Sequence, residues 1–307
     1  MVQIGLMLEG QNGLNWERWK RIVRVAEDSG YQCLFRSDHY TNANPPDYDS
    51  LELWVSLTYL ASHTNRIEFG PLVTPVTFRH PTMTIRMAAQ VDDLSGGRLT
   101  LGMGAGWQER EHHHFGVPFY DVPTRFAMFE EALQMTRLLF DSDEPVSFAG
   151  EHFALNDAIL LPRPARPGGP PILIGGNGPK LTLPLVAKYA TEWNGLFISS
   201  AAYAERNERL NQLLEAEGRQ PGDVKRSVMT QVNFGKDDAA VAKKIGDRDA
   251  DSLRERGVLV GTASEVIDQI GAMAEAGVER FMLQWLDLDD IDGIELMAHE
   301  VLPHFHK

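Results

Sequence analysis

The sequence has a single cysteine, Cys33, among its 307 residues. One cysteine cannot form an intramolecular disulfide, and it excludes every cysteine-rich zinc site. The sequence also lacks an apolar run approaching the ~20 residues that a membrane-spanning helix needs. Its first ten residues, MVQIGLMLEG, have no basic segment ahead of an apolar one. These absences predict a cytoplasmic protein that does not span a membrane, with Cys33 packed in its core.

Basic residues are scarce relative to acidic ones. The chain has 29 Lys and Arg against 43 Asp and Glu, which gives a formal net charge of −14. Such a charge repels nucleic acids and anionic membranes, and no local basic patch compensates for it. With 43% hydrophobic residues the chain can still bury a large core. We therefore expect a soluble protein whose partner is a small molecule rather than a nucleic acid.

Short apolar runs typical of buried strands alternate with amphipathic helical segments along the chain. The predicted strands are 4–8, 33–37, 67–74, 99–104, 172–176, 193–198, 226–235 and 280–286. The predicted helices are 16–29, 49–62, 81–94, 124–140, 180–190, 201–217, 238–256, 263–276 and 290–304. Eight evenly spaced βα units favour an α/β fold of the (β/α)8 TIM-barrel class over an open sheet. We expect one domain over residues 1–307, with 106–123 and 142–170 as insertion loops.

Two ionisable residues, Asp38 and His39, directly follow the second predicted strand. In a TIM barrel the carboxyl ends of the strands form the active-site rim, so both side chains are expected there. An imidazole titrates near neutral pH and can accept or donate a proton in a reaction. The alternative is structural: Asp38 caps the following segment, and His39 packs against a neighbouring loop.

Glycines follow the fourth and fifth predicted strands. Gly102, Gly104 and Gly106 in LGMGAGW would let the backbone lie against a flat ligand, or else form a turn. The segment GGNG, residues 175–178, is expected to lead directly into a helix, with Pro179 in its first turn. Backbone N–H groups at that helix start would bind an anion, with Lys180 adding charge. The spacing matches neither a Walker loop nor a Rossmann fingerprint.

Four ordered segments carry a family resemblance. They are SDHY, LVTPVTFRHP, DLSGGRLTLGMGAGWQEREHHHFG and PILIGGNGPKLTLPLVAKYATEWN. Together they resemble the luciferase-like monooxygenase superfamily, and within it the branch that uses the deazaflavin coenzyme F420. The resemblance implies a TIM barrel with an insertion, often a homodimer, which holds a flavin or deazaflavin in the barrel mouth.

The resemblance also implies roles for individual residues. His39 would transfer the proton that accompanies hydride transfer, and Asp38 would orient the ring or His39. A non-prolyl cis peptide is expected between Leu72 and Val73, behind the cofactor ring. The other implied cofactor contacts are Thr74 behind the ring, Ala105, Gly106 and Glu111 along its edge and tail, and Gly175, Gly176, Asn177 and Gly178 at the phosphate.

Three other functions remain open. An FMN-dependent two-component monooxygenase would share the fold and the phosphate loop, and a flavin-binding protein without catalytic activity would share the site. A metal-dependent hydrolase is suggested by EHHHF, residues 111–115. However, the first strand ends in Glu9 and Gly10 without a histidine pair, and three adjacent histidines cannot all face one ion from a regular helix. We therefore predict no metal and a solvated or lid-facing histidine cluster.

Neither the substrate nor the direction of hydride transfer follows from the sequence. Aromatic and histidine side chains in the two insertion loops suggest an apolar substrate pocket, although they could equally pack the loops themselves. These residues are Trp107, His112, His113, His114, Phe119, Tyr120, Phe148 and Phe153.

Overall fold

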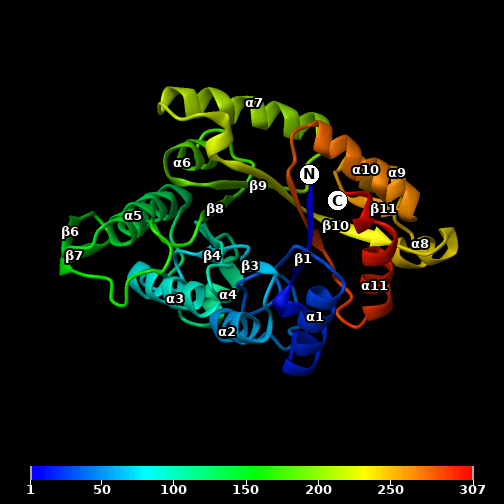
Figure 1. Cartoon of the computed structure of the whole chain (residues 1–307), viewed down its shortest axis with the longest axis horizontal. Helices are drawn as coiled ribbons and strands as arrows, with labels where there is room; N and C mark the ends of the chain where they lie inside the picture. Colours follow the sequence, from blue (N-terminus) through cyan, green and yellow to red (C-terminus); the bar gives the residue numbers. More distant parts are fainter. Residues whose placement is uncertain (1, 306–307) are drawn as a thin grey trace.

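The computed structural model describes residues 2–305, which form a barrel of parallel strands surrounded by helices (Figure 1). In the order in which they pair, the strands are β3 (Glu68–Pro71), β2 (Cys33–Arg36), β1 (Gln3–Leu8), β12 (Arg280–Gln284), β10 (Lys225–Phe234), β9 (Glu192–Leu196), β8 (Ile172–Gly175), β5 (Leu101–Gly104) and β4 (Thr74–Pro75). A parallel bridge between Phe69 and Leu99 joins the first member of this order to the segment before β5. The ring is thereby closed, and the predicted TIM barrel is confirmed.

The third predicted strand is interrupted. Residues 67–74 were predicted as the third strand, and β3 and β4 are two pieces of it; the peptide bond between Leu72 and Val73 is cis, as the resemblance implied. The glycines of β5 make room for this break. A Cβ on Gly102 would lie 2.1 Å from the carbonyl oxygen of Pro71, and one on Gly104 would lie 2.6 Å from Cγ2 of Val73. Only glycine allows β5 to approach so closely.

The helices cover the outside of the barrel, close to the predicted positions. They are α1 (Trp16–Asp28), α2 (Leu53–His63), α3 (Pro81–Leu94), α5 (Val122–Asp141), α6 (Thr182–Tyr189), α7 (Ser200–Ala216), α8 (Asp238–Ile245), α9 (Ala250–Glu255), α10 (Ala263–Glu275) and α11 (Ile291–Glu300). Side-chain caps begin several of them; for example, Asn15 accepts a hydrogen bond from the amide of Arg18, and Asp121 accepts one from Thr124. None of the helices between residues 2 and 305 combines the length and apolar character that a bilayer span requires.

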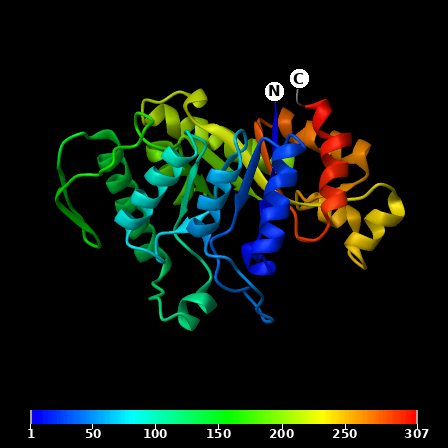
Figure 2. The same ribbon diagram turned by 60° about the horizontal axis from the view of Figure 1, so that its bottom comes forward.

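Both long connections contain structure of their own. Residues 106–123 include the short helix α4 (Glu109–His114), and 142–170 include the antiparallel hairpin of β6 (Val146–Ala149) and β7 (Ala154–Ala158). Figure 2 shows α4 and the loop after β2 extending from the same end of the barrel. An ion pair between Arg110 and Asp47, with an N···O distance of 2.7 Å, joins them. A short strand that we did not predict, β11 (Leu259–Gly261), pairs with the end of β10.

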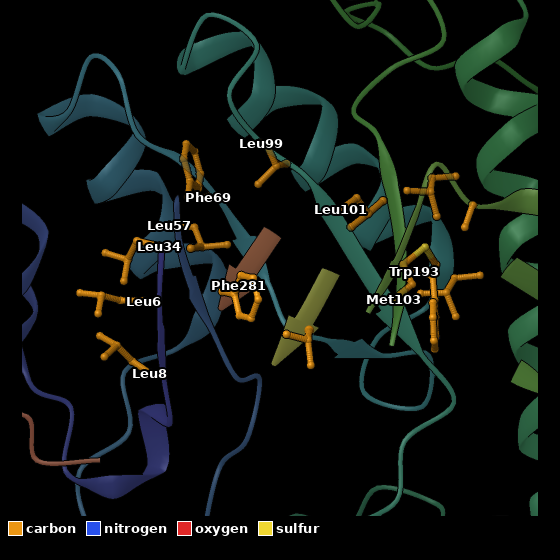
Figure 3. Packing of buried hydrophobic residues seen from close by; sticks show 14 of the residues in the cluster. Leu6, Leu8, Leu34, Leu57, Phe69, Leu99, Leu101, Met103, Trp193 and Phe281 are labelled. Carbon is orange, nitrogen blue, oxygen red and sulfur yellow. The ribbon is translucent and has the colours of Figure 1, made fainter. Parts of the chain in front are cut away.

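Alternate residues of each strand pack in two separate cores. Leu6 and Leu8 point outward to the helices with Leu34, Phe69 and Leu101 (Figure 3). The intervening positions point into the barrel and form a smaller apolar cluster of Met7, Cys33, Phe35, Leu72, Leu173, Met229 and Met282. Cys33 is fully buried there, as predicted. This inner cluster fills the middle of the barrel and separates its two ends.

Candidate active site

A cavity of about 710 Å³ lies at the carboxyl ends of the strands. Each strand of the ring ends in or near its wall, so residues far apart in sequence converge on one volume. The inner apolar cluster forms its floor through Met7, Leu72 and Met229. The predicted site residues that line it are His39, Leu72, Val73, Ala105, Gly106, Glu111 and Gly175.

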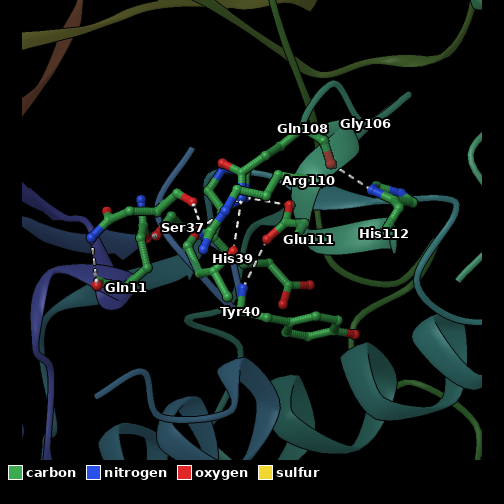
Figure 4. Close-up of polar contacts among 12 residues, drawn as sticks. Gln11, Ser37, His39, Tyr40, Gly106, Gln108, Arg110, Glu111 and His112 are labelled. Carbon is green, nitrogen blue, oxygen red and sulfur yellow. Dashed lines mark hydrogen bonds and ion pairs between the residues drawn. The ribbon is translucent and has the colours of Figure 1, made fainter. Parts of the chain in front are cut away.

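His39 and Glu111 form a hydrogen-bonded pair in this cavity (Figure 4). The Nδ1 atom of His39 lies 2.7 Å from Oε1 of Glu111, and the amide of Tyr40 donates to Oε2 at 2.9 Å. Because a carboxylate can only accept hydrogen bonds, the proton of a neutral His39 sits on Nδ1. Its Nε2 has no hydrogen-bond partner within residues 2–305 and is therefore free to accept a proton. Trp107 packs edge-on against the imidazole, with 5.6 Å between ring centroids.

The pKa of His39 reflects two opposing influences. Burial alone would lower it, but the hydrogen bond and negative charge of Glu111, with smaller contributions from Glu9 and Asp38, raise the pKa above its ordinary value of 6.5. The pair therefore favours the imidazolium form. A raised pKa makes the imidazole a stronger proton acceptor during a reaction.

Asp38 forms its hydrogen bonds away from His39, and its predicted role in orienting the ring or His39 stays a prediction. Its carboxylate accepts hydrogen bonds from Oγ1 of Thr74 at 2.7 Å and from Arg79, whose Nη1 lies 2.5 Å from Oδ2. Arg79 also contacts Glu52 at 2.7 Å. Asp38 is thus buried in a salt bridge behind the cavity wall. Thr74, predicted to contact the ring, is likewise turned to this network and does not line the cavity.

The wall opposite the polar pair is apolar and closely packed. Val73 projects between two glycine-bearing strands: a Cβ on Gly104 would clash with it at 2.6 Å, and one on Gly175 would touch it at 3.4 Å. Leu72 and Ala105 extend the same surface. An apolar wall that faces hydrogen-bonding side chains suits a flat heteroaromatic ring, which has apolar faces and polar edges.

The GGNG loop differs in two ways from our prediction. Helix α6 starts at Thr182, four residues after Gly178, so the glycines do not form the first helical turn. The amide of Gly176 donates to the carbonyl of Asn194 at 2.9 Å and is not free for an anion. The side chain of Asn177 is held by Leu196, donating to its carbonyl at 2.6 Å and accepting from its amide at 2.9 Å.

Two amides of this loop remain candidates for holding a phosphate. The N–H groups of Asn177 and Gly178 have no acceptor within residues 2–305, and Lys180 follows them on an exposed turn. Of the four predicted phosphate residues, only Gly175 lines the cavity itself. The loop therefore fits a phosphate at the edge of the cavity, bound by two backbone amides rather than by a helix start.

Sequence reasoning missed a second polar group in the cavity. Glu9 accepts hydrogen bonds from Nε2 of Gln284 at 2.6 Å and from Nε2 of Gln11 at 2.8 Å. Gln11 accepts in turn from Ser37 at 2.7 Å. These residues lie at the ends of β1, β2 and β12. Their position at strand ends was the signal that could have found them, because any polar residue there faces the rim.

The three adjacent histidines separate between interior and surface. His112 is fully buried, with Nε2 2.7 Å from Oγ1 of Thr77 and Nδ1 2.7 Å from the carbonyl of Gln108. Of the predicted solvated or lid-facing cluster, His113 and His114 are exposed, whereas His112 is buried within the insertion. Within residues 2–305 no group of three or more possible ligands could hold a metal ion. Of the loop residues suggested for an apolar pocket, only Trp107 lines the cavity.

The chain is similar to several known proteins. The family model described as luciferase-like monooxygenase matches residues 2–250. An F420-dependent glucose-6-phosphate dehydrogenase of Kineococcus radiotolerans is 31% identical over 70% of this chain and 63% of its own length. A 4-hydroxyprotoasukamycin monooxygenase of Streptomyces nodosus is 26% identical over 96% of this chain and 88% of that protein.

Among solved structures, an F420-dependent secondary alcohol dehydrogenase in complex with an F420-acetone adduct superposes with a TM-score of 0.87. The superposition covers 98% of each chain at 21% identity. At this identity the likeness establishes the shared fold.

Proposed function

The chain belongs to the luciferase-like monooxygenase family of enzymes, and we propose that it transfers a hydride between coenzyme F420 and a small organic substrate. The observation that carries the proposal is the His39–Glu111 pair, which presents an unpaired imidazole nitrogen to a cavity with an apolar opposite wall. A proton-transfer group facing a ring-shaped space is what alcohol oxidation or carbonyl reduction needs.

When bound, a deazaflavin supplies a carbon in place of the flavin N5, which suits it to two-electron hydride transfer and not to oxygen activation. The residues that would hold it are those of the apolar wall, chiefly Leu72, Val73 and Ala105. The free amides of Asn177 and Gly178 would hold its phosphate.

His39 would carry the proton of the reaction. In alcohol oxidation, Nε2 of His39 takes the hydroxyl proton while the carbinol C–H bond releases a hydride to the cofactor, and a carbonyl forms. In the reverse reaction the imidazolium returns the proton to the carbonyl oxygen as the hydride arrives. Glu111 fixes the Nδ1–H tautomer and stabilises the imidazolium, which is a positioning role.

An FMN-dependent monooxygenase is the second candidate. The name of the Streptomyces nodosus relative, whose match covers 96% of this chain, favours it. Such an enzyme would use the same wall and phosphate loop but would react with oxygen.

Parallel titration of the purified protein with F420 and with FMN, followed by the fluorescence of each cofactor, separates the two candidates. We expect micromolar or tighter binding of F420 and at least ~10-fold weaker binding of FMN. Preferential binding of FMN would contradict the proposal and favour the monooxygenase.

We also propose that residues 1–307 act as one domain and that the protein forms a homodimer through α2 and α3. A groove of about 530 Å³ between these helices is lined mainly by apolar side chains, among which Val55 and Leu94 are each more than half exposed. Sedimentation should give a dimer that Leu94→Glu dissociates. A monomeric wild-type protein at micromolar concentration would contradict this part.

A further inference from the structure

We infer that the substrate of this cavity is uncharged and has an apolar body, so phosphorylated and carboxylated substrates are excluded. The inference deepens the proposed function, since it rests on the cavity as the place of hydride transfer. Two independent features carry it: the charges that line the cavity, and the side chains at its mouth.

The cavity lining has acidic groups and no permanent cation. Glu9 and Glu111 both line it, and His39 is the only basic side chain among the lining residues that the structure describes. The protonation of His39 at most balances Glu111, which leaves Glu9 with neutral amide partners. An anionic substrate group near Glu9 and Glu111, away from the phosphate loop, meets uncompensated negative charge at short range, where the local dielectric constant is below that of water.

Arg79 and Arg110 on the surrounding loops are engaged elsewhere, while Arg125 of α5 donates to the carbonyl of Gly106 and does not line the cavity. Arg79 is bound to Asp38 and Glu52, and Arg110 forms two 2.7 Å contacts with Asp47. A substrate anion would have to break an existing ion pair to recruit either guanidinium. Neither lines the cavity, in contrast to the charged clamps by which proteins usually bind phosphate and carboxylate groups.

The mouth of the cavity is apolar and exposed. Trp107, Phe197 and Leu286 line the cavity, yet they are 64%, 41% and 42% exposed, respectively. Phe197 has a backbone φ of 43°, a left-handed conformation that bulky residues rarely adopt, and its amide donates to the carbonyl of Met229 at 3.1 Å. Large apolar side chains clustered at a cavity mouth mark a ligand surface, and strained backbone collects at such places.

Together these features define a chemical class. The reacting hydroxyl or carbonyl would lie near His39, and the apolar body would lie against Trp107, Phe197 and Leu286. Alcohols, ketones and aldehydes with hydrocarbon or aryl substituents satisfy both conditions. Sugar phosphates and hydroxy acids satisfy neither.

Two isosteric probes test the charge preference directly. 4-(1-Hydroxyethyl)benzamide and 4-(1-hydroxyethyl)benzoate have the same shape and differ by one negative charge. We expect calorimetry with the F420-loaded protein to give a Kd for the benzoate at least ~10-fold higher than that for the benzamide. Equal affinity, tighter binding of the benzoate, or no binding of either probe would overturn the inference.

A charge placed at the mouth should change this preference. Leu286→Lys should narrow the gap between the two probes at least ~3-fold by strengthening benzoate binding. The matched control Leu138→Lys adds the same charge on α5, outside the cavity, and should leave the ratio unchanged. If both variants shift the ratio equally, the selection does not arise in the cavity and the inference fails.

The proposed function fails separately from this inference. Calorimetry on protein without cofactor measures the probes alone, and the F420 titration measures the cofactor alone. A protein that prefers the benzamide but does not bind F420 would refute the proposed function and keep the charge preference. A protein that binds F420 and binds both probes equally would refute the charge preference and keep the proposed function.

Discussion

The two ends of the barrel both contain buried charges, but these charges are satisfied in different ways. At the amino end, Arg280 is almost fully buried and bonds to Glu192 at 3.1 Å, to Glu68, and to Gln3 at 2.8 Å. Burial alone would lower the pKa of Arg280, but the charges of Glu192 and Glu68 raise it well above its ordinary value. Arg280, Glu192 and Glu68 therefore each have an opposite charge beside them.

At the carboxyl end the acids have no permanent cation beside them in the cavity. Glu9 is bound by two glutamine amides, and Glu111 by a histidine that can lose its charge. The comparison indicates that the amino end of the barrel serves stability and the carboxyl end serves the reaction. The ion pairs of Arg280 hold the strands together at the amino end, whereas the incomplete pairing at the carboxyl end leaves a proton acceptor and a charge preference for a ligand to use.

The largest expected effect concerns the amino end. Arg280→Met should lower the free energy of unfolding by ~3–5 kcal/mol, because it leaves the buried carboxylate of Glu192 without its cation. Urea denaturation measures this loss, and activity per folded molecule should stay near wild type. Lys188→Met, which breaks a partly exposed pair with Glu130, is the control and should change the midpoint far less. Equal losses of unfolding free energy in the two variants would show that the buried ion pair of Arg280 contributes no more to stability than an exposed pair.

The next effect concerns the carboxyl end. His39→Ala should lower kcat by ~10²-fold or more, since it removes the group that takes the proton in the transition state. The Kd for F420 should change only a few-fold, and stability should fall less than in Arg280→Met. Steady-state kinetics and urea denaturation on the same preparations make the comparison. Unchanged turnover would assign the imidazole a structural role like that of Arg280.

A smaller effect should follow from Glu111→Gln. Its carboxylate accepts from both His39 and Tyr40, but a glutamine has one acceptor oxygen and can satisfy only one of them. We expect kcat to fall roughly 10-fold. The pKa of His39 should drop, because the negative charge of Glu111 no longer opposes the effect of burial. For alcohol oxidation, in which His39 must be deprotonated, the acidic limb of the pH–rate profile should therefore move to lower pH.

The same variant has a signature in stability. The folded-state pKa of His39 is raised above 6.5, so its protonation favours the folded state. This contribution is complete below pH 6.5 and is lost as the pH rises through the folded-state pKa. The stability gap between wild type and Glu111→Gln should hence be larger at pH 5.5 than at pH 8.5. A gap that widens with rising pH would show that the pair is not coupled as described.

The smallest effect concerns the apolar wall. A Cβ on Gly175 would contact Val73 at 3.4 Å, an ordinary van der Waals distance, so Gly175→Ala should keep the fold intact. The added methyl group lies in the cavity, and we expect F420 to bind ~3- to 10-fold more weakly. Gly222→Ala is the control, because its Cβ would meet nothing within 4 Å and the site lies outside the cavity. Normal F420 binding by Gly175→Ala would show that the cofactor ring does not lie against this wall.

The barrel could be predicted from the sequence because each of its units repeats a local pattern. Helix α3 has the predicted ends, 81–94, since Pro81 marks its start and Gly96 follows its end. The position of His39 at the rim followed from the same pattern. Strand β11 could not be found, because three residues carry too little periodicity.

The partners within the site could not be predicted from local patterns. Glu111 meets His39 across 72 residues, from an insertion whose path the barrel repeat does not determine. Asp38 instead forms a salt bridge with Arg79, which lies 41 residues further along the chain. The amide of Gly176 cannot donate a hydrogen bond to an anion, because it already donates to the carbonyl of Asn194 on the neighbouring strand. The prediction of one domain over 1–307 and the roles of the cofactor contacts stay predictions.

The most direct test of the account is chemical rescue of His39→Ala. Single-turnover reduction of bound F420 by an alcohol substrate would be followed by absorbance, with and without added imidazole. If His39 takes the proton, the variant should react ~10²-fold more slowly than wild type, and imidazole should restore at least several-fold of that loss. A variant that reacts as fast as wild type, or that imidazole leaves unchanged, would contradict proton transfer by His39.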